Sequence, residues 1–203
     1  MEKGKKTRDR ILQAAYQLFL REGYSEVTLN ELVAAAGLTK GGFYHHFSSK
    51  DELFAEVVDR YLLSFYRQLR DEIMKTGGSA RDKLKTLCGR VCSLPAQLLE
   101  DEREELKFGY YILIFQGIKH YPRFVEKLAS VYRKMRHAVE EILLEGVQKG
   151  ELRPGLDCEA AAFQIISQAE GALFMWTMDK SIDLAGYNRK AFESIWDCIS
   201  RPG

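Results

Sequence analysis

The sequence predicts an all-α protein of about nine helices. Apolar residues recur at three- and four-residue spacing along almost all of the 203 residues, which is the period of an amphipathic helix. No stretch alternates apolar and polar residues between hairpin turns, as a half-buried strand would. Glycine and proline residues stand between the periodic segments, so they mark where one helix ends and the next begins.

The first expected helix has one apolar face and stops at Gly23. That face consists of Ile11, Ala15, Leu18 and Phe19. A cluster of basic residues lies before this helix or on its first turn. A residue without a β-carbon at position 23 allows the chain to turn out of the helix.

A second, short helix is expected to begin at Thr28. The segment Thr28-Leu-Asn-Glu31 has the pattern of a capping box, in which the Thr hydroxyl accepts from the backbone at Glu31 and the Glu carboxylate reaches back. Gly37 ends this helix, because glycine turns easily into the left-handed conformation.

Two further helices follow. The third covers about residues 39–47 and has Phe43 and Phe47 one turn apart on its inner face. The fourth begins at Ser49, where Ser49 and Glu52 form a second capping-box pattern, and continues to about residue 75. At 1.5 Å per residue it is about 39 Å long, which suits a connector between two domains.

Five more helices complete the expected fold, at about 79–93, 102–118, 122–149, 157–178 and 187–200. The turn signals that separate them are Pro95, Tyr121-Pro122, Arg153-Pro154-Gly155 and Ala185-Gly186.

Charge is unevenly distributed. The whole chain carries a formal charge of +1, which by itself indicates neither a nucleic acid nor a membrane as partner. Residues 1–50 nevertheless hold eight basic and five acidic residues, whereas the remainder holds 22 basic and 24 acidic residues. Basic character therefore concentrates at the N-terminal end.

The sequence favours a cytoplasmic protein. Its four cysteines follow no disulfide framework, and the polar first ten residues are not followed by the apolar core of a signal peptide. The longest apolar run, residues 110–115, is far shorter than the roughly 20 residues of a membrane span.

Residues 28–50 have the layout of a helix-turn-helix DNA reader, in which two short helices are joined by a glycine-containing turn. Lys40 and Lys50 stand at or beside helix starts, where the helix dipole is positive and disfavours a cation. A docked phosphate would reverse that effect. The pattern therefore indicates several contacts to one duplex backbone.

Two consecutive glycines, Gly41 and Gly42, occupy the third helix, although each costs about 1 kcal/mol relative to Ala there. A close approach of the backbone to another molecule would explain them. Tyr44 and His45 lie on the face opposite Phe43 and can donate to phosphate oxygens. The alternative is that Tyr44 is ordinary surface and His45 and His46 cap a small core.

Residues 8–54, and above all Thr28 to Leu53, resemble the N-terminal DNA-binding domain of the TetR/AcrR (tetracycline-repressor) family. The resemblance implies a homodimeric transcriptional regulator, usually a repressor, that binds double-stranded DNA and is released by a small-molecule inducer. It implies DNA contacts from Thr28, Thr39, Lys40, Gly41, Gly42, Tyr44, His45 and Lys50. We therefore expect a DNA-binding domain over residues 1–50 and a ligand-binding and dimerisation domain over 51–203, with the helix at about 49–75 as connector.

Two neighbouring positions depart from the family pattern. Gly42 stands where family members more often carry Ser, Thr or Asn, and Phe43 replaces a more usual Leu. Without side chains at 41 and 42, base readout falls to few residues, such as Lys40 to guanine and Tyr44 to a thymine methyl group. Operator choice would then depend more on DNA shape.

The second expected domain carries no equally specific motif. Its candidate ligand-binding residues are mostly aromatic and would line an apolar cavity: Cys92, Phe108, Tyr111, Phe115, Phe124 and Trp176. The alternative is that these residues fill the core. We expect no cofactor beyond a small-molecule effector of unknown identity.

Cys88 and Cys92 are four residues apart and share a helical face. Such a pair could form a redox or metal sensor, but two ligands without a second pair are a weak signal for a metal site. Buried cysteine most often acts as a small hydrophobic residue. We therefore expect no metal.

Apolar stripes on the last two helices suit self-association. The candidate dimer residues are Ile165, Ala169, Ala172, Phe192, Ile195, Trp196 and Ile199. By resemblance they would form a four-helix dimer interface. The alternative is that both helices form the core of a monomer.

Three functions remain open. The first is a ligand-responsive regulator, and the second is a DNA-binding regulator without an inducer, which a core lacking a cavity would favour. The third, an enzyme, is disfavoured because the sequence contains no phosphate loop or His-Glu-x-x-His motif.

Overall fold

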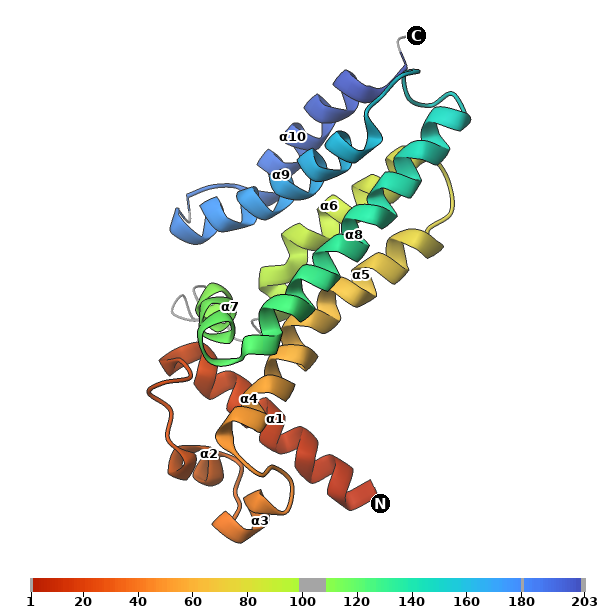
Figure 1. Ribbon diagram of the computed structural model, residues 1–203. Helices are drawn as coiled ribbons and strands as arrows, with labels where there is room; N and C mark the ends of the chain where they lie inside the picture. The colour runs from red at the N-terminus through yellow and green to blue at the C-terminus, as the bar shows by residue number, and fades with distance from the viewer. Residues whose placement is uncertain (1, 99–108, 180, 202–203) are drawn as a thin grey trace. The chain divides into compact units, whose positions relative to one another are not determined.

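The computed structural model describes residues 2–98, 109–179 and 181–201 (Figure 1). These residues confirm the all-α prediction, since their only backbone pairing of the β type is an isolated bridge between Leu152 and Ser200. The helices are α1 (Glu2–Glu22), α2 (Leu29–Ala35), α3 (Lys40–Tyr44), α4 (Lys50–Val57), the π-helix η1 (Val58–Leu63), α5 (Ser64–Lys75), α6 (Ala80–Leu98), α7 (Gly109–His120), α8 (Pro122–Gln148), α9 (Cys158–Met178) and α10 (Leu184–Ile199). With α4, η1 and α5 counted as one helix, the described residues contain nine.

The chain forms two compact units. The N-terminal unit comprises Met1–Phe65 and Leu98–Ala129, and the C-terminal unit comprises Tyr66–Gln97 and Ser130–Gly203. The first division therefore falls fifteen residues beyond the expected domain boundary at residue 50. The N-terminal unit is larger than the predicted DNA-binding domain because it also includes α7. Helix α1 packs against α7 as well as against α2 and α4, and α7 also packs against η1.

Phenylalanines form the core of the N-terminal unit. Phe19, Phe43, Phe47 and Phe54 are at most 1% exposed, and the rings of Phe19 and Phe54 meet edge to face with centroids 5.3 Å apart. Each buried ring stabilises the fold by roughly 1.5–3 kcal/mol. This core joins α1, α3 and α4, so it fixes the short helix α3 on the rest of the unit.

The connector predicted over about residues 49–75 is a continuous helix from Lys50 to Lys75. Its middle six residues, Val58–Leu63, adopt the π-helical conformation. The wider i to i+5 hydrogen bonding of a π-helix is rare and is found mostly in short segments. The division between the two units falls two residues after this segment, within α5.

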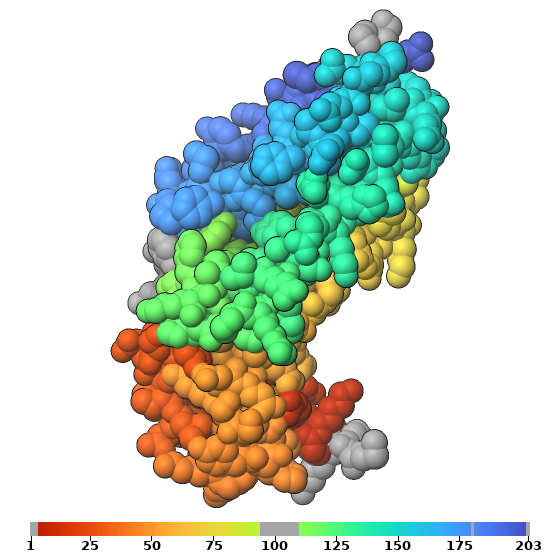
Figure 2. All heavy atoms as spheres, viewed as in Figure 1, coloured from red at the N-terminus to blue at the C-terminus, as the bar shows by residue number. Residues whose placement is uncertain are grey.

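Helices α9 and α10 pack side by side in the C-terminal unit (Figure 1), and their atoms form one continuous layer of surface (Figure 2). Asp157 caps α9 by accepting from the backbone N–H of Ala160 at 3.0 Å. The end of α10 is joined to the α8–α9 connection, where the N–H of Arg153 donates to the carbonyl of Ile199 at 3.0 Å.

Three predicted helix boundaries are wrong. Helix α3 ends at Tyr44 and not near residue 47. Helix α6 continues three residues beyond Pro95, because a proline this near the end removes only one backbone hydrogen bond from a long helix. Helix α10 begins at Leu184, and Ala185-Gly186 lies in its first turn. The Asp183 carboxylate caps this earlier start by accepting from the N–H of Gly186 at 3.0 Å.

None of the helices in the described residues combines the length and the apolar character that crossing a membrane requires.

Candidate nucleic-acid interface

Threonine hydroxyls cap both short helices of the predicted reader. Thr28 Oγ1 accepts from the backbone N–H of Glu31 at 3.3 Å, and the Glu31 carboxylate accepts from the backbone N–H of Thr28 at 2.7 Å. These reciprocal bonds confirm the predicted capping box. The hydrogen bonds that the Glu31 carboxylate accepts from the backbone and hydroxyl of Thr28 lower the pKa of Glu31. Thr39 Oγ1 accepts from the N–H of Gly42 at 3.1 Å. Both threonines are exposed, so both helix starts face solvent.

Helix α3 buries one face and exposes the other. Phe43 is fully buried, whereas Tyr44 is 53% exposed and His45 is also exposed. Lys40, at the first position of α3, is exposed as well. Because residues four apart share a helix face, Lys40 and Tyr44 present their side chains to the same side of α3.

The paired glycines of α3 have no strong intramolecular explanation. A β-carbon built at Gly41 would meet no atom within 4 Å, and one at Gly42 would lie 3.4 Å from Thr39 Oγ1, an ordinary contact. Neither residue has a positive φ. The fold itself therefore tolerates side chains at both positions, which strengthens the interpretation that another molecule approaches the backbone here.

Lys50 is the first residue of α4, and its side chain is half-buried. Its Nζ lies 4.3 Å from the centroid of the Tyr24 ring, a cation–π contact that orients the side chain. Burial lowers the pKa of Lys50, and the carboxylates of Glu26 and Glu31 oppose that shift. A phosphate bound at this helix start would therefore meet an ammonium group that is already partly positioned.

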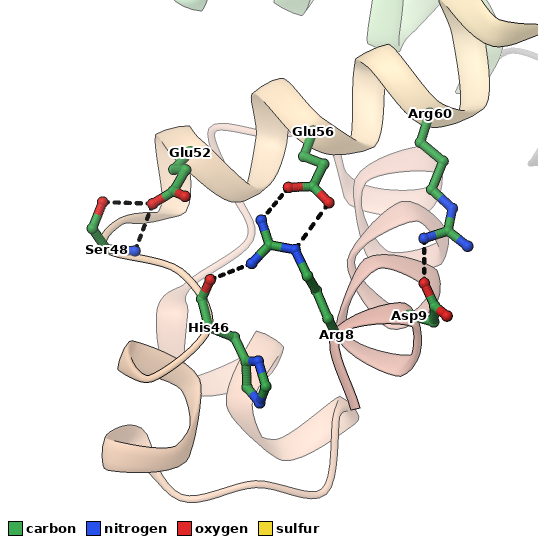
Figure 3. A network of polar contacts seen from close by, with 7 residues as sticks. All are labelled: Arg8, Asp9, His46, Ser48, Glu52, Glu56 and Arg60. Atoms are coloured by element: carbon green, nitrogen blue, oxygen red, sulfur yellow. Dashed lines mark hydrogen bonds and ion pairs between the residues drawn. The ribbon is translucent and has the colours of Figure 1, made fainter. Parts of the chain in front are cut away.

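Arg8 of α1 contacts both α4 and the segment that follows α3 in the helix-turn-helix region (Figure 3). The Arg8 guanidinium donates to both carboxylate oxygens of Glu56 in α4, with Nε 3.1 Å from Oε1, and to the backbone carbonyl of His46 just after α3. It also lies 4.1 Å from the centroid of the Phe47 ring. Arg8 therefore fixes the end of α3 relative to α1 and α4.

A second ion pair joins α1 to η1. Arg60 donates to Asp9 Oδ1 at 2.5 Å (Figure 3), and this hydrogen bond lowers the pKa of Asp9. From the sequence, Arg8 is only one member of the N-terminal basic cluster. Its partner Glu56 is 48 residues away, and no local spacing signals such a pair.

The second predicted capping box is only half formed. Ser49 Oγ accepts from the N–H of Glu52 at 3.0 Å, as expected. The Glu52 carboxylate, however, accepts from the backbone N–H and the hydroxyl of Ser48, at 2.7 and 2.6 Å, and not from Ser49 (Figure 3). Because Ser48 supplies two donors, the Glu52 carboxylate binds the residue before the helix cap and not the cap residue Ser49 itself.

The candidate ligand-binding residues are divided between the two units. Tyr111, Phe115 and Phe124 belong to the N-terminal unit, whereas Cys92 and Trp176 belong to the C-terminal unit. Phe124 is fully buried and Phe115 is 61% exposed. Phe108 lies outside the described residues.

The described part of the C-terminal unit contains a larger and a smaller cavity. The larger, of about 320 Å³, is open to solvent between α6 and α10 and includes Cys92. The smaller, of about 10 Å³, is apolar except for Tyr66, Tyr132 and Glu170. None of these three residues is among the sequence-predicted site residues. A visible signal existed for Glu170, which is the only charged residue of α9 beyond its first turn.

The environment of Cys88 and Cys92 suits a structural role. Burial raises the pKa of the Cys88 thiol to about 12 and also raises that of Cys92. The Asn188 amide donates to Cys92 Sγ at 2.7 Å and to the Cys88 carbonyl at 2.9 Å. A protonated, buried thiol is a poor nucleophile and a poor metal ligand. No cluster of three potential metal ligands occurs in the described part of the chain.

Most of the candidate dimer residues are buried within one chain. Ile165, Ala169, Phe192, Trp196 and Ile199 are at most 9% exposed, and Ala172 and Ile195 are half-buried. They occupy the contact between α9 and α10 and the core beneath it. The large exposed apolar side chains of these helices are instead Phe163, Phe174, Met175, Met178 and Tyr187.

Comparisons with known proteins agree with this geometry. Residues 11–57 match the family model described as bacterial regulatory proteins of the tetR family, and residues 119–192 match the tetracyclin repressor-like C-terminal domain. A probable HTH-type transcriptional regulator, ArpR of Pseudomonas putida, is 26% identical over 98% of this chain and 93% of its own length.

A second relative is closer in identity over a shorter span. The HTH-type transcriptional repressor KstR2 of Mycolicibacterium smegmatis is 30% identical over 75% of this chain and 70% of its own length. Among solved structures, the SmeT–triclosan complex has a TM-score of 0.75 and 26% identity, over 98% of this chain and 93% of that one. With both halves matched by TetR models and a helix-turn-helix in the expected place, the chain belongs to the TetR family of bacterial regulatory proteins.

Proposed function

We propose that this regulator is a cytoplasmic, dimeric repressor, not an enzyme, that binds a palindromic DNA operator and is released by a small molecule. The observation that carries the DNA-binding part is the exposed face of α3, where Gly41 lacks a side chain although the fold has room for one. Family membership and the relative named as a repressor support the regulatory role. The SmeT structure with triclosan supports a small-molecule effector.

DNA contacts divide into two kinds in this proposal. Thr28, Thr39, His45 and Lys50 hold phosphates from the exposed helix starts and the end of α3, which positions the protein on the duplex. Lys40 and Tyr44 point into the major groove, where they read a guanine and a thymine methyl group. The bare backbone of Gly41 and Gly42 lets α3 lie close to the DNA.

The dimer surface consists of exposed residues beside the predicted stripe. Phe163, Ser167, Gly171, Phe174 and Met178 recur every three or four residues on one exposed face of α9. The small residues Ser167 and Gly171 allow a second helix to approach closely, and a β-carbon at Gly171 would meet no atom within 4 Å. A twofold dimer presents two reading helices to two half-sites one helical turn or a multiple apart.

The continuous helix from Lys50 to Lys75 links the DNA-binding unit to the C-terminal unit. A ligand that prefers one state of the C-terminal unit shifts the population of the dimer between two spacings of its reading helices. Ligand and operator must then weaken each other's binding by the same factor.

The size of the smaller cavity favours a second candidate. At about 10 Å³ it holds no more than a single water molecule, which would suit a regulator that works without an inducer. A ligand needs this core to open, or it needs the larger cavity beside Cys92.

Selection from a random duplex library with the purified protein tests the DNA-binding proposal. We expect a palindrome to be enriched and its affinity to fall steeply with salt. Lys50→Ala should weaken binding to all sequences alike and reduce the salt slope by about one, whereas Lys40→Ala should also relax the preference at one base position. Failure to enrich any sequence would refute the proposal, and equal losses from both variants on every sequence would refute base reading by Lys40.

A further inference from the structure

Three polar side chains meet inside the apolar C-terminal unit. Tyr66 of α5 donates from its hydroxyl to Glu170 Oε1 of α9 at 3.1 Å. Tyr132 of α8 donates from its hydroxyl to the Tyr66 oxygen at 3.2 Å, and the two phenol rings lie 5.2 Å apart. The three residues come from three helices. Tyr66 is buried and Tyr132 and Glu170 are half-buried, so they form a polar centre at the edge of the core.

Among the described residues, the side chains around this centre are apolar and include no cation. The other side chains that line the cavity are Leu69, Leu87, Val91, Met135, Ile166 and Ala169. Burial raises the pKa of Glu170 to about 7, although the two neighbouring phenols oppose the shift. A carboxylate in such a place costs folding free energy unless a cation accompanies it.

The polar centre has more hydrogen-bond acceptor sites than donors. An ionised carboxylate accepts about four hydrogen bonds, and each phenol supplies only one O–H. Tyr66 donates to Glu170, and the two phenols together supply at most two O–H groups, so the carboxylate can accept further hydrogen bonds at the cavity that it lines. The group that complements this centre is therefore a donor, and a positively charged donor complements it best.

We infer that the effector of this regulator is a lipophilic amine, whose ammonium group binds Glu170 while its apolar body lies among the surrounding aliphatic side chains. The inference rests on the proposed ligand-regulated function. The cavity of about 10 Å³ accommodates only the head group, so the apolar body enters by displacing side chains such as Met135. Methionine is suited to this because it is unbranched and adapts its shape.

Three probes of equal chain length and different head group test the inference: decylamine, decanol and decanoate. Each is titrated calorimetrically into the purified full-length protein. We expect decylamine to bind about ten-fold or more tightly than decanol, and decanoate to bind most weakly. Decanol can also donate a hydrogen bond, so a preference for the amine reports the charge.

Glu170→Gln should abolish the preference for the amine while leaving decanol binding within about two-fold of wild type. The matched control is Glu159→Gln, the same change on the same helix at an exposed side chain, which should leave the preference intact. Equal binding of amine and alcohol to the wild type, tighter binding of decanoate, or an amine preference that survives Glu170→Gln would overturn the inference.

DNA binding measured in the same samples separates this inference from the proposed function. If the protein binds its selected operator and shows no amine preference, the ligand class is wrong and the repressor proposal stands. If decylamine binds through Glu170 but the operator is not released, the ligand site stands and its role as inducer site fails.

Discussion

Arg8 illustrates how one side chain can position a binding surface that it does not belong to. Its guanidinium satisfies the His46 carbonyl directly after α3 and the Glu56 carboxylate of α4. Arg8 is therefore a positioning residue, because its charge is already engaged inside the protein. The exposed cations near α3, such as Lys40, are the ones available to DNA.

Replacing Arg8 by Met should destabilise the protein by about 1–2 kcal/mol, because it leaves the Glu56 carboxylate and the His46 carbonyl without their partner. The expected loss of stability is moderate because the side chains of Arg8 and Glu56 are both 35% exposed and solvent screens their charges. Urea unfolding followed by circular dichroism measures the change.

Arg10→Met is the matched control for this variant. Arg10 is exposed on the same helix, so its replacement should change the free energy of unfolding by less than about 0.5 kcal/mol. Equal effects of the two variants would show that the contacts of Arg8 contribute nothing specific.

At the scale of elements, the glycines in the first turn of α3 lower the stability of that helix. Gly41→Ala should stabilise the free protein by about 0.5–1 kcal/mol, because alanine favours the helix and its β-carbon meets no atom within 4 Å. The same change should weaken operator binding, since the added methyl group separates α3 from the DNA. Thermal unfolding and fluorescence anisotropy with the selected duplex measure the two effects.

Gly37→Ala provides the contrast. Space is equally open at Gly37, but its φ of +60° is one that alanine adopts at a cost of about 1 kcal/mol. This variant should lose stability where Gly41→Ala gains it. Unchanged DNA affinity in Gly41→Ala would contradict the close approach of the backbone.

At the scale of the whole molecule, dimerisation depends on the exposed face of α9. Met178→Glu should convert the protein to a monomer, because it places a charge on an apolar side chain that is 59% exposed in the single chain and buried in the proposed interface. Sedimentation velocity measures the oligomeric state, and affinity for the palindrome should fall with it.

Lys134→Glu is the control for the dimer prediction, since it reverses a charge at an exposed position on α8 without introducing one into the apolar face. This variant should remain dimeric. A dimeric Met178→Glu protein would place the interface elsewhere.

Glu170 also makes the stability of the whole protein depend on pH. Its pKa is about 7 in the folded protein, above the ordinary value of 4.5, so the folded state holds the proton more tightly than the unfolded state does. Stability from this group is fully present below about pH 4.5 and is lost as the pH rises through about 7.

Glu170→Gln keeps the shape of the side chain and cannot ionise. The free energy of unfolding of this variant relative to wild type should therefore rise by about 1–3 kcal/mol between pH 5 and pH 8. Urea unfolding of both proteins across this range measures the difference, in which the other titrating carboxylates cancel. If the difference in unfolding free energy between the two proteins does not change with pH, the pKa of Glu170 is not raised by burial in the folded protein.

Local signals in the sequence determined most of the fold and the position of the DNA-binding surface. Helical periodicity and the cap at Thr28 depend on residues three or four apart, so they can be recognised without knowing the tertiary structure. Residues 28–50 likewise form their surface from neighbours in the chain, and the resemblance to TetR proteins rests on the same segment.

Tertiary structure decided which distant side chains meet and which apolar stripes are buried. Arg8 and Glu56 are 48 residues apart, and Tyr66 and Glu170 are 104 apart. Such pairs arise only when helices pack. The stripe at Phe192 and Trp196 faces the core of its own chain rather than solvent. An apolar stripe is buried equally well by its own chain or by another copy, because hydrophobic burial is not directional; only the packing of α9 on α10 determines which of the two occurs.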